Sequence, residues 1–155
     1  STQAKTLFPY TTLFRSDMLL QRAARKQATV LTPHPLEAAR LLGSSTAQVQ
    51  ADRLSAAEHL AERFACCVVL KGSGTVIAMP GHTTRINTTG NGLLATGGTG
   101  DVLAGLLGAR LAALNDVTND AWQAACDAVW THGHAADEWP ANHALTASRL
   151  SERLR

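Results

Sequence analysis

The chain has 155 residues, of which 45% are hydrophobic and 17% charged, and its formal net charge is +2 at pH 7. This length and composition are typical of one globular domain and exclude an intrinsically disordered chain. The low net charge, without a run of basic residues, argues against a nucleic-acid-binding protein, and no apolar stretch reaches the length that crosses a membrane.

The first predicted elements follow an N-terminal stretch without a clear period. Residues 1–16 hold neither the helical nor the strand pattern, so we expect an unrelated or disordered leader there and one domain over residues 17–155. Within that domain, residues 17–27 predict a short helix and residues 29–32 a brief buried strand.

A histidine between two prolines follows this strand. Pro35 holds His34 in extended backbone at the carboxyl end of the strand, which is where open α/β sheets bind ligands. Pro35 also suits the first position of a helix that ends before Gly43, a natural C-cap. On its position alone, an ordinary loop histidine without a ligand is the preferred interpretation of His34.

The next predicted helix lies on the surface and precedes a central strand. A capping box at Ser45–Gln48 and apolar residues at helical spacing up to Phe64 predict one amphipathic helix, to which we assign no chemistry. The apolar run Cys66–Leu70 predicts a strand covered on both faces. Cys66 and Cys67 then point to opposite faces and are not expected to pair, and a total of three cysteines favours the reducing cytoplasm.

A loop of small polar residues, Lys71–Thr75, follows the central strand. Its amides, hydroxyls and one ammonium group suit a nucleotide phosphate, although the loop does not match the P-loop pattern. The alternative is a turn with a solvated lysine at the entry of a hairpin. Residues 76–79 and 83–87 predict that hairpin, which turns about Pro80 and Gly81.

A glycine-rich stretch, Thr96–Asp101, leads directly into the apolar run Val102–Gly108, which predicts a buried helix. A glycine loop that opens a helix directs free amides and the positive end of the helix dipole at one point. That point suits a phosphate group or a developing negative charge. Asp101 stands where a general base is wanted, and the alternative is a simple helix cap.

Two further helices are predicted over residues 120–138 and 145–154. The first contains His132 and His134, two residues apart, with Asp137 nearby. Residues at this spacing do not share a face of a helix, so we expect no metal site there.

Several of these stretches together resemble the ADP-dependent NAD(P)H-hydrate dehydratases, a branch of the ribokinase-like superfamily. The resemblance implies an α/β, three-layer ribokinase-like fold with a central, mostly parallel sheet and helices on both faces. Because the family's domain is longer, we expect residues 17–155 to be its C-terminal part, truncated at the N-terminus. The stretches that carry the resemblance are Thr32–Glu37, Leu70–Ile77, Gly90–Asn91, Thr96–Leu103, Trp130–Gly133 and Ala144–Ser148.

The resemblance implies a repair reaction in which hydrated NADH or NADPH loses water at the expense of ADP, or of ATP. The ring hydroxyl is phosphorylated, phosphate is then eliminated, and Mg²⁺ bridges the nucleotide phosphates. By the same resemblance, Asp101 is the catalytic base and His34 and Asp101 contact the hydrated dinucleotide. The anion hole is formed by Gly98, Thr99 and Gly100, and the nucleotide is held by Lys71, Gly72, Ser73, Gly74, Thr75 and Gly100.

The sequence departs from the family pattern at some positions, which keeps two alternatives open. Arg149 stands where the family commonly has aspartate, and only Asp17–Leu19 echoes an acidic stretch that precedes the proline-flanked histidine in the family. One alternative is a ribokinase-like kinase for hydroxymethylpyrimidine, thiazole or a sugar, and the other is a non-catalytic truncated fragment. Members of the family are often oligomeric, which leaves a homo-oligomer open. No nucleic-acid or membrane partner is expected, and the expected location is cytoplasmic.

Overall fold

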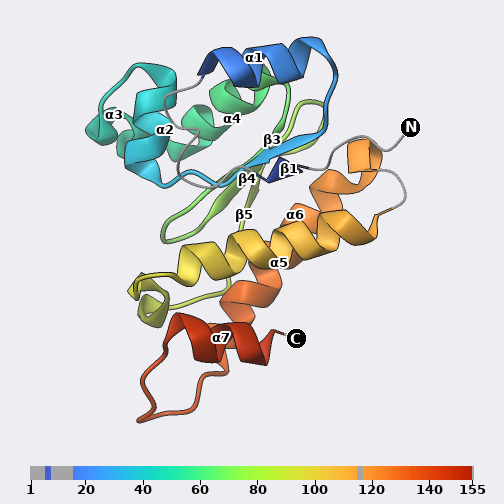
Figure 1. Ribbon diagram of the computed structural model, residues 1–155. Coiled ribbons are helices and arrows are strands. Elements are labelled where there is room, and N and C mark those ends of the chain that lie inside the picture. Colours follow the sequence, from blue (N-terminus) through green and yellow to red (C-terminus); the bar gives the residue numbers. More distant parts are fainter. Residues whose placement is uncertain (1–5, 8–15, 115–116, 155) are drawn as a thin grey trace.

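A five-stranded sheet forms the centre of the computed structural model, which describes residues 6–7, 16–114 and 117–154 (Figure 1). The strand order follows the chain, β1 to β5. The first three strands are parallel, and β4 and β5 each pair antiparallel with the preceding strand. Four strands therefore run in one direction and β4 in the other. The strands are β1 (Thr6–Leu7), β2 (Thr29–Leu31), β3 (Cys67–Leu70), β4 (Val76–Ala78) and β5 (Arg85–Ile86).

Helices cover both faces of this sheet, as the family resemblance implies (Figure 1). One face is covered by α1 (Ser16–Ala24), α2 (Pro35–Leu42), α3 (Thr46–Ala51) and α4 (Arg53–Phe64). The other is covered by α5 (Thr99–Ala113) and α6 (Val117–Asp137). A short 3₁₀ helix, η2 (Gly92–Ala95), precedes α5, and α7 (Ala147–Arg153) packs against α5 and α6.

The strand β3 separates two hydrophobic cores. Val68 and Leu70 belong to the core with α1–α4, whereas Cys67 and Val69 belong to the core with α5 and α6. Because side chains alternate across a strand, every residue of β3 is buried, and the prediction of a doubly covered central strand is confirmed. Cys66 and Cys67 lie in different cores and do not pair with each other, as predicted. Cys126 is also a free thiol.

Local capping signals place the starts of α2 and α3 correctly. His34 caps α2, Pro35 follows at its first turn, and Gly43 ends it in left-handed backbone with φ 68°. The prediction of one helix from the Ser45 box to Phe64 is wrong, because Asp52 ends α3 and starts α4. Its carboxylate accepts a hydrogen bond from the Ser55 amide at 3.0 Å, which caps a new helix.

The helix α5 is buried along one face only. Leu103, Leu107 and Leu111 pack in the core against the sheet, while Asp101 and Gly105 are exposed. The apolar run from Val102 to Gly108 therefore predicts the helix correctly but overstates its burial.

Part of the predicted leader, residues 1–5 and 8–15, lies outside the described residues. Thr6–Leu7 forms β1 beside β2, and Ser16 begins α1, which ends at Ala24, earlier than predicted. The division into a leader of residues 1–16 and a domain of residues 17–155 stays a prediction. Within the described ranges, no helix is both long enough and apolar enough to span a bilayer.

Candidate active site

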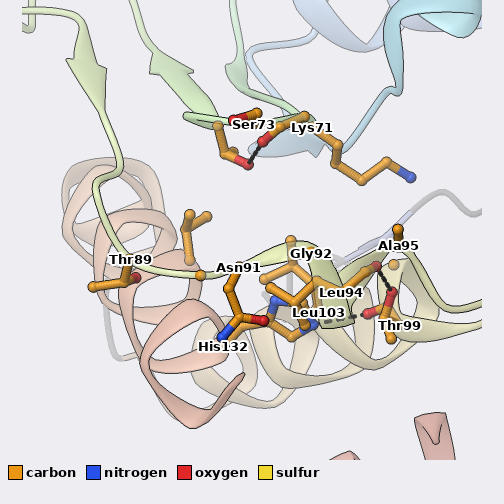
Figure 2. Close-up of a pocket in the computed structure, with 15 residues that line it drawn as sticks. Lys71, Ser73, Thr89, Asn91, Gly92, Leu94, Ala95, Thr99, Leu103 and His132 are labelled. Carbon is orange, nitrogen blue, oxygen red and sulfur yellow. Dashed lines mark hydrogen bonds between the residues drawn. The ribbon is translucent and has the colours of Figure 1, made fainter. Parts of the chain in front are cut away.

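A pocket of about 400 Å³ opens between the loop after β3 and the helices α5 and α6. Figure 2 shows Lys71 and Ser73 on one side of this pocket and Asn91, Thr99 and His132 on the other. The pocket is lined by Lys71, Gly72, Ser73, Thr75, Thr89, Gly90, Asn91, Gly92, Leu94, Ala95, Thr99, Gly100, Leu103, Val129 and His132.

The loop Lys71–Thr75 is fixed from behind by neighbouring elements. The Lys71 amide donates a hydrogen bond to the Pro33 carbonyl at 2.8 Å, so the loops after β2 and β3 lie side by side. From α4, the Arg53 guanidinium donates to the carbonyls of Leu70 and Ser73. A Cβ atom on Gly72 would lie 2.8 Å from that guanidinium, so this position requires glycine. The contacts that hold the loop to neighbouring elements are therefore made by its backbone groups rather than by its hydroxyl groups.

The first turn of α5 faces this loop. Gly98 caps the helix in left-handed backbone with φ 86°, and no side chain caps it. The Thr99 hydroxyl donates to the Leu94 and Thr96 carbonyls, at 2.7 and 2.9 Å, which fixes the turn that leads into the helix. The Gly100 amide has no hydrogen-bond partner within the described ranges. A bare amide at a helix N-terminus is a ready site for a negatively charged group.

One lysine and one buried carboxylate connect the two predicted ligand loops. The Lys71 Nζ atom lies 3.3 Å from the place a Cβ atom would take on Gly100 and 3.9 Å from Glu37 Oε2. Glu37 Oε1 lies 3.3 Å from His34 Nε2. Glu37 thus connects His34 to Lys71, and Lys71 in turn borders Gly100. Asp101, the next residue of α5, has an exposed carboxylate that makes no hydrogen bond or ion pair with any described residue.

The pocket contains only some of the residues that the sequence singles out. Of these, it is lined by Lys71, Gly72, Ser73, Thr75, Thr99 and Gly100. His34, Gly74, Gly98 and Asp101 lie beside it in sequence or contact but do not line it. The roles that the family resemblance assigns to all ten residues stay predictions.

A second wall of the pocket was not predicted from the sequence. The segment 87–92 docks onto α6 through four hydrogen bonds. The Thr89 hydroxyl donates to the Trp130 carbonyl at 3.0 Å, and the Gly90 amide donates to the Asp137 carboxylate at 2.8 Å. The Asn91 side-chain amide donates to the Ala136 carbonyl at 2.8 Å and to the Asp137 carboxylate at 3.3 Å. The resemblance includes Gly90 and Asn91, but their partners lie more than 40 residues further along the chain. Nothing local in the sequence indicates this docking.

His132 lies buried at the floor of the pocket. Its Nε2 atom lies 2.9 Å from the Thr99 carbonyl oxygen, so it joins α6 to the first turn of α5. Burial lowers the pKa of the His132 imidazole below its ordinary 6.5, and the bond to Thr99 opposes this shift. His134 instead stacks on Trp130 and pairs with Glu138 at 3.3 Å, so the two histidines use different faces, as predicted. Among the described residues no cluster of three histidine, cysteine or acidic side chains could hold a metal.

Comparison with solved structures defines the class of the fold, which is ribokinase-like. The ADP/ATP-dependent NAD(P)H-hydrate dehydratase from Bacillus subtilis, co-crystallised with ATP and Mg²⁺, superposes with a TM-score of 0.73 at 35% identity, over 98% of this chain and 50% of that one. A ribokinase-like superfamily protein from Enterococcus faecalis gives a TM-score of 0.68 at 25% identity, over 89% of this chain and 48% of that one.

Sequence comparison defines the family within this class. The NAD(P)H-hydrate dehydratase family matches residues 12–155, and the chain belongs to that family. It is 46% identical to the ADP-dependent (S)-NAD(P)H-hydrate dehydratase of Neisseria meningitidis, over 81% of this chain and 41% of that protein. It is 38% identical to the enzyme of the same name from Bacillus subtilis, over 84% and 47% respectively. The chain thus spans about half the length of the curated relatives it matches, or less.

Proposed function

We propose that this chain carries the nucleotide and reaction end of an ADP-dependent NAD(P)H-hydrate dehydratase. The observation that supports this most directly is the placement of the Lys71 ammonium over Gly100, the residue that precedes Asp101 in the first turn of α5. A phosphate at the bare amide of Gly100 would meet a positive charge from the loop and a base from the helix. The named relatives are dehydratases of NAD(P)H hydrate, which supplies the substrate class.

The residues divide into three roles in this proposal. Asp101 takes the proton from the ring hydroxyl of the hydrated nicotinamide as that oxygen attacks the terminal phosphorus of ADP or ATP. The bond from this phosphorus to the bridging oxygen breaks, and AMP or ADP leaves. The amides of Gly98, Thr99 and Gly100 stabilise the charge on the transferred phosphoryl group. The loop from Lys71 to Thr75 holds the nucleotide, and His34 contacts the hydrated dinucleotide. Elimination of phosphate from the ring then restores NADH or NADPH.

The donor set of the site fits a nucleotide with its magnesium ion. The pocket offers the Ser73 hydroxyl, the Lys71 ammonium and the unpaired Gly100 amide, all of which can donate to phosphate oxygens. Magnesium bound mainly through substrate phosphates and water needs few protein ligands, in keeping with the lack of an acidic cluster among the described residues. When bound, Mg²⁺ would neutralise charge on the phosphates.

Two finer assignments belong to the same proposal. We assign the reaction to the cytoplasm, which the three free, buried thiols support. We leave homo-oligomer formation as an expectation from the family. A measurement of mass in solution by light scattering tests it.

The test of the proposed function is the recovery of NADH absorbance from hydrated NADH with ADP and Mg²⁺. We expect Asp101→Asn to lower the rate by about 10²–10⁴-fold, the range contributed by a positioned base, while the melting temperature stays unchanged. Asp120→Asn, at an exposed aspartate of α6, is the matched control and should keep full activity.

Other outcomes of this test would overturn the proposal in distinct ways. Unchanged turnover in Asp101→Asn would remove Asp101 from the mechanism. A stable phosphorylated product that accumulates from ATP would instead indicate a ribokinase-like kinase. Absence of both turnover and ADP binding by calorimetry would show that the chain is a non-catalytic fragment.

A further inference from the structure

Glu37 is a buried carboxylate beside the candidate site that the proposed mechanism does not use. It lies in the first turn of α2, and its side chain is only 6% exposed. Oε2 accepts a hydrogen bond from the His34 amide at 2.7 Å, and the Glu37 amide donates in return to His34 Nδ1 at 3.2 Å. These two bonds form a capping box, which is a sufficient local reason for a side chain of this length at this position.

The capping box does not explain why this side chain is charged. The chain contains a second capping box, at the start of α3, in which Gln48 takes the equivalent place. There the Ser45 amide donates to Gln48 Oε1 at 2.9 Å, so a neutral amide completes the same motif. A buried carboxylate is unfavourable unless a positive group or several hydrogen bonds compensate it. The negative charge of Glu37 therefore calls for a further partner.

That partner is the ammonium group of Lys71. Its Nζ atom lies 3.9 Å from Glu37 Oε2, and the lysine side chain is 22% exposed. On its other side, the same ammonium borders Gly100, where even a methyl group would lie within 3.3 Å. Glu37 and the absence of a side chain at position 100 together place the positive charge over the first turn of α5.

The same residue also contacts His34. The Glu37 backbone amide donates a hydrogen bond to His34 Nδ1, so the neutral ring carries its proton on Nε2. Nε2 lies 3.3 Å from Glu37 Oε1. One side chain therefore contacts both the histidine expected to meet the dinucleotide and the lysine expected to meet the nucleotide.

We propose that Glu37 is a positioning residue, whose charge holds the Lys71 ammonium over the first turn of α5, while its carboxylate also accepts the hydrogen bond of the His34 backbone amide. The catalytic part of this inference rests on the proposed function, because the ammonium then stands where charge develops on the transferred phosphoryl group. The coupling of Glu37 to Lys71 is a property of the folded chain and is testable without turnover.

The first experiment is a double-mutant cycle in thermal stability. Lys71→Met leaves the Glu37 carboxylate buried without its cation, and we expect the melting temperature to fall by about 5 °C. Glu37→Gln alone retains the capping box and should change the melting temperature by less than about 2 °C. In the double variant, Glu37→Gln should recover most of the loss. Additive effects, with no recovery, would overturn the inference. Lys71→Arg, which keeps the charge, should retain the wild-type melting temperature.

The second experiment separates binding from turnover. We expect Glu37→Gln to lower kcat about tenfold while the Kd for ADP, measured by calorimetry, changes less than about threefold, because a misplaced ammonium affects the reacting group more than the bound nucleotide. Gln48→Glu, the reverse exchange in the α3 capping box, is the control and should change neither quantity. Equal kcat in Glu37→Gln and wild type would overturn the positioning role.

The two experiments distinguish failure of this inference from failure of the proposed function. If the wild-type chain binds ADP but does not turn over hydrated NADH, the proposed function fails, and the stability cycle alone decides whether Glu37 and Lys71 are coupled. If turnover is present but the cycle is additive, the dehydratase assignment stands and the role given to Glu37 is wrong.

Discussion

His132 is a buried histidine whose single described hydrogen bond joins two helices at the candidate site. The bond to the Thr99 carbonyl ties α6 to the first turn of α5, the turn that presents the bare amide of Gly100. Because burial disfavours the charged imidazolium, the pKa of His132 lies below its ordinary 6.5. The neutral ring is therefore the form that the folded chain requires.

This shift predicts how stability depends on pH. Below about pH 6.5 the unfolded chain takes up a proton at His132 while the folded chain does not, so stability is lost as pH falls through this range. Above it, both states are neutral and the effect disappears. We expect His132→Gln, which does not titrate, to show a flatter fall in melting temperature between pH 7.5 and 5 than wild type. His143→Gln, at an exposed histidine, is the control. Parallel curves for His132→Gln and wild type would contradict the prediction.

At the scale of elements, Gly133 of α6 allows the segment 87–92 to pack closely against that helix. A Cβ atom on Gly133 would overlap the Thr89 hydroxyl and come within 2.7 Å of Thr89 backbone atoms. These backbone atoms cannot rotate away as a side chain can, so the segment itself would have to move. The close approach allows the four hydrogen bonds that dock this wall of the pocket onto α6.

We therefore expect Gly133→Ala to destabilise the fold by about 1–3 kcal/mol, the usual range for an overpacked site. Gly105 in α5 offers a matched comparison, because it is also helical and a Cβ atom there would meet nothing within 4 Å. Gly105→Ala should stabilise the chain by about 0.4–1 kcal/mol, because alanine favours a helix. Urea denaturation of both variants tests whether the free energy of unfolding falls in Gly133→Ala and rises in Gly105→Ala. A stabilising Gly133→Ala would show that the segment moves freely.

The elements that the sequence predicts well are those with a local physical signal. Proline and glycine bracket α2, a hydroxyl and an amide cap α3, and an unbroken apolar run marks β3. The break at Asp52 was missed because the helical spacing of apolar residues continues across it, while the cap is made by one carboxylate. For the site, residue types suggest the Lys71 loop and the first turn of α5. Glu37 and His132 were missed because their functional contacts, to Lys71 and Thr99, join segments more than 30 residues apart.

On the scale of the whole molecule, the candidate site lies at the end of β3, the strand whose residues divide between the two cores. The loop after β3 continues a strand that belongs to both cores, and α5 and α6 belong to the second core. A third, smaller core, which includes Ala136 and Leu150, attaches α7 to α6. A ligand held between the Lys71 loop and α5 would therefore connect structural units that otherwise share only the sheet.

This arrangement predicts that Mg²⁺ and ADP stabilise the chain, and that the effect depends on position 100. At a ligand concentration of 100 times its Kd, binding to the folded state adds about 2.7 kcal/mol, which corresponds to a rise in melting temperature of about 5–10 °C. The three atoms nearest to a methyl group on Gly100 all belong to the flexible Lys71 side chain, so we expect Gly100→Ala to keep or slightly raise the stability without ligand.

The same methyl group would displace the Lys71 ammonium from the first turn of α5 and narrow the approach to its bare amide. We therefore expect the rise in melting temperature caused by ADP to be less than half as large in Gly100→Ala as in wild type, as measured by differential scanning calorimetry. Gly105→Ala, one turn further along α5, should retain the full rise. An equal rise in all three proteins would place the nucleotide elsewhere. A full rise in Gly100→Ala that is lost in Lys71→Met would mean that the ammonium binds the nucleotide without the help of the helix N-terminus.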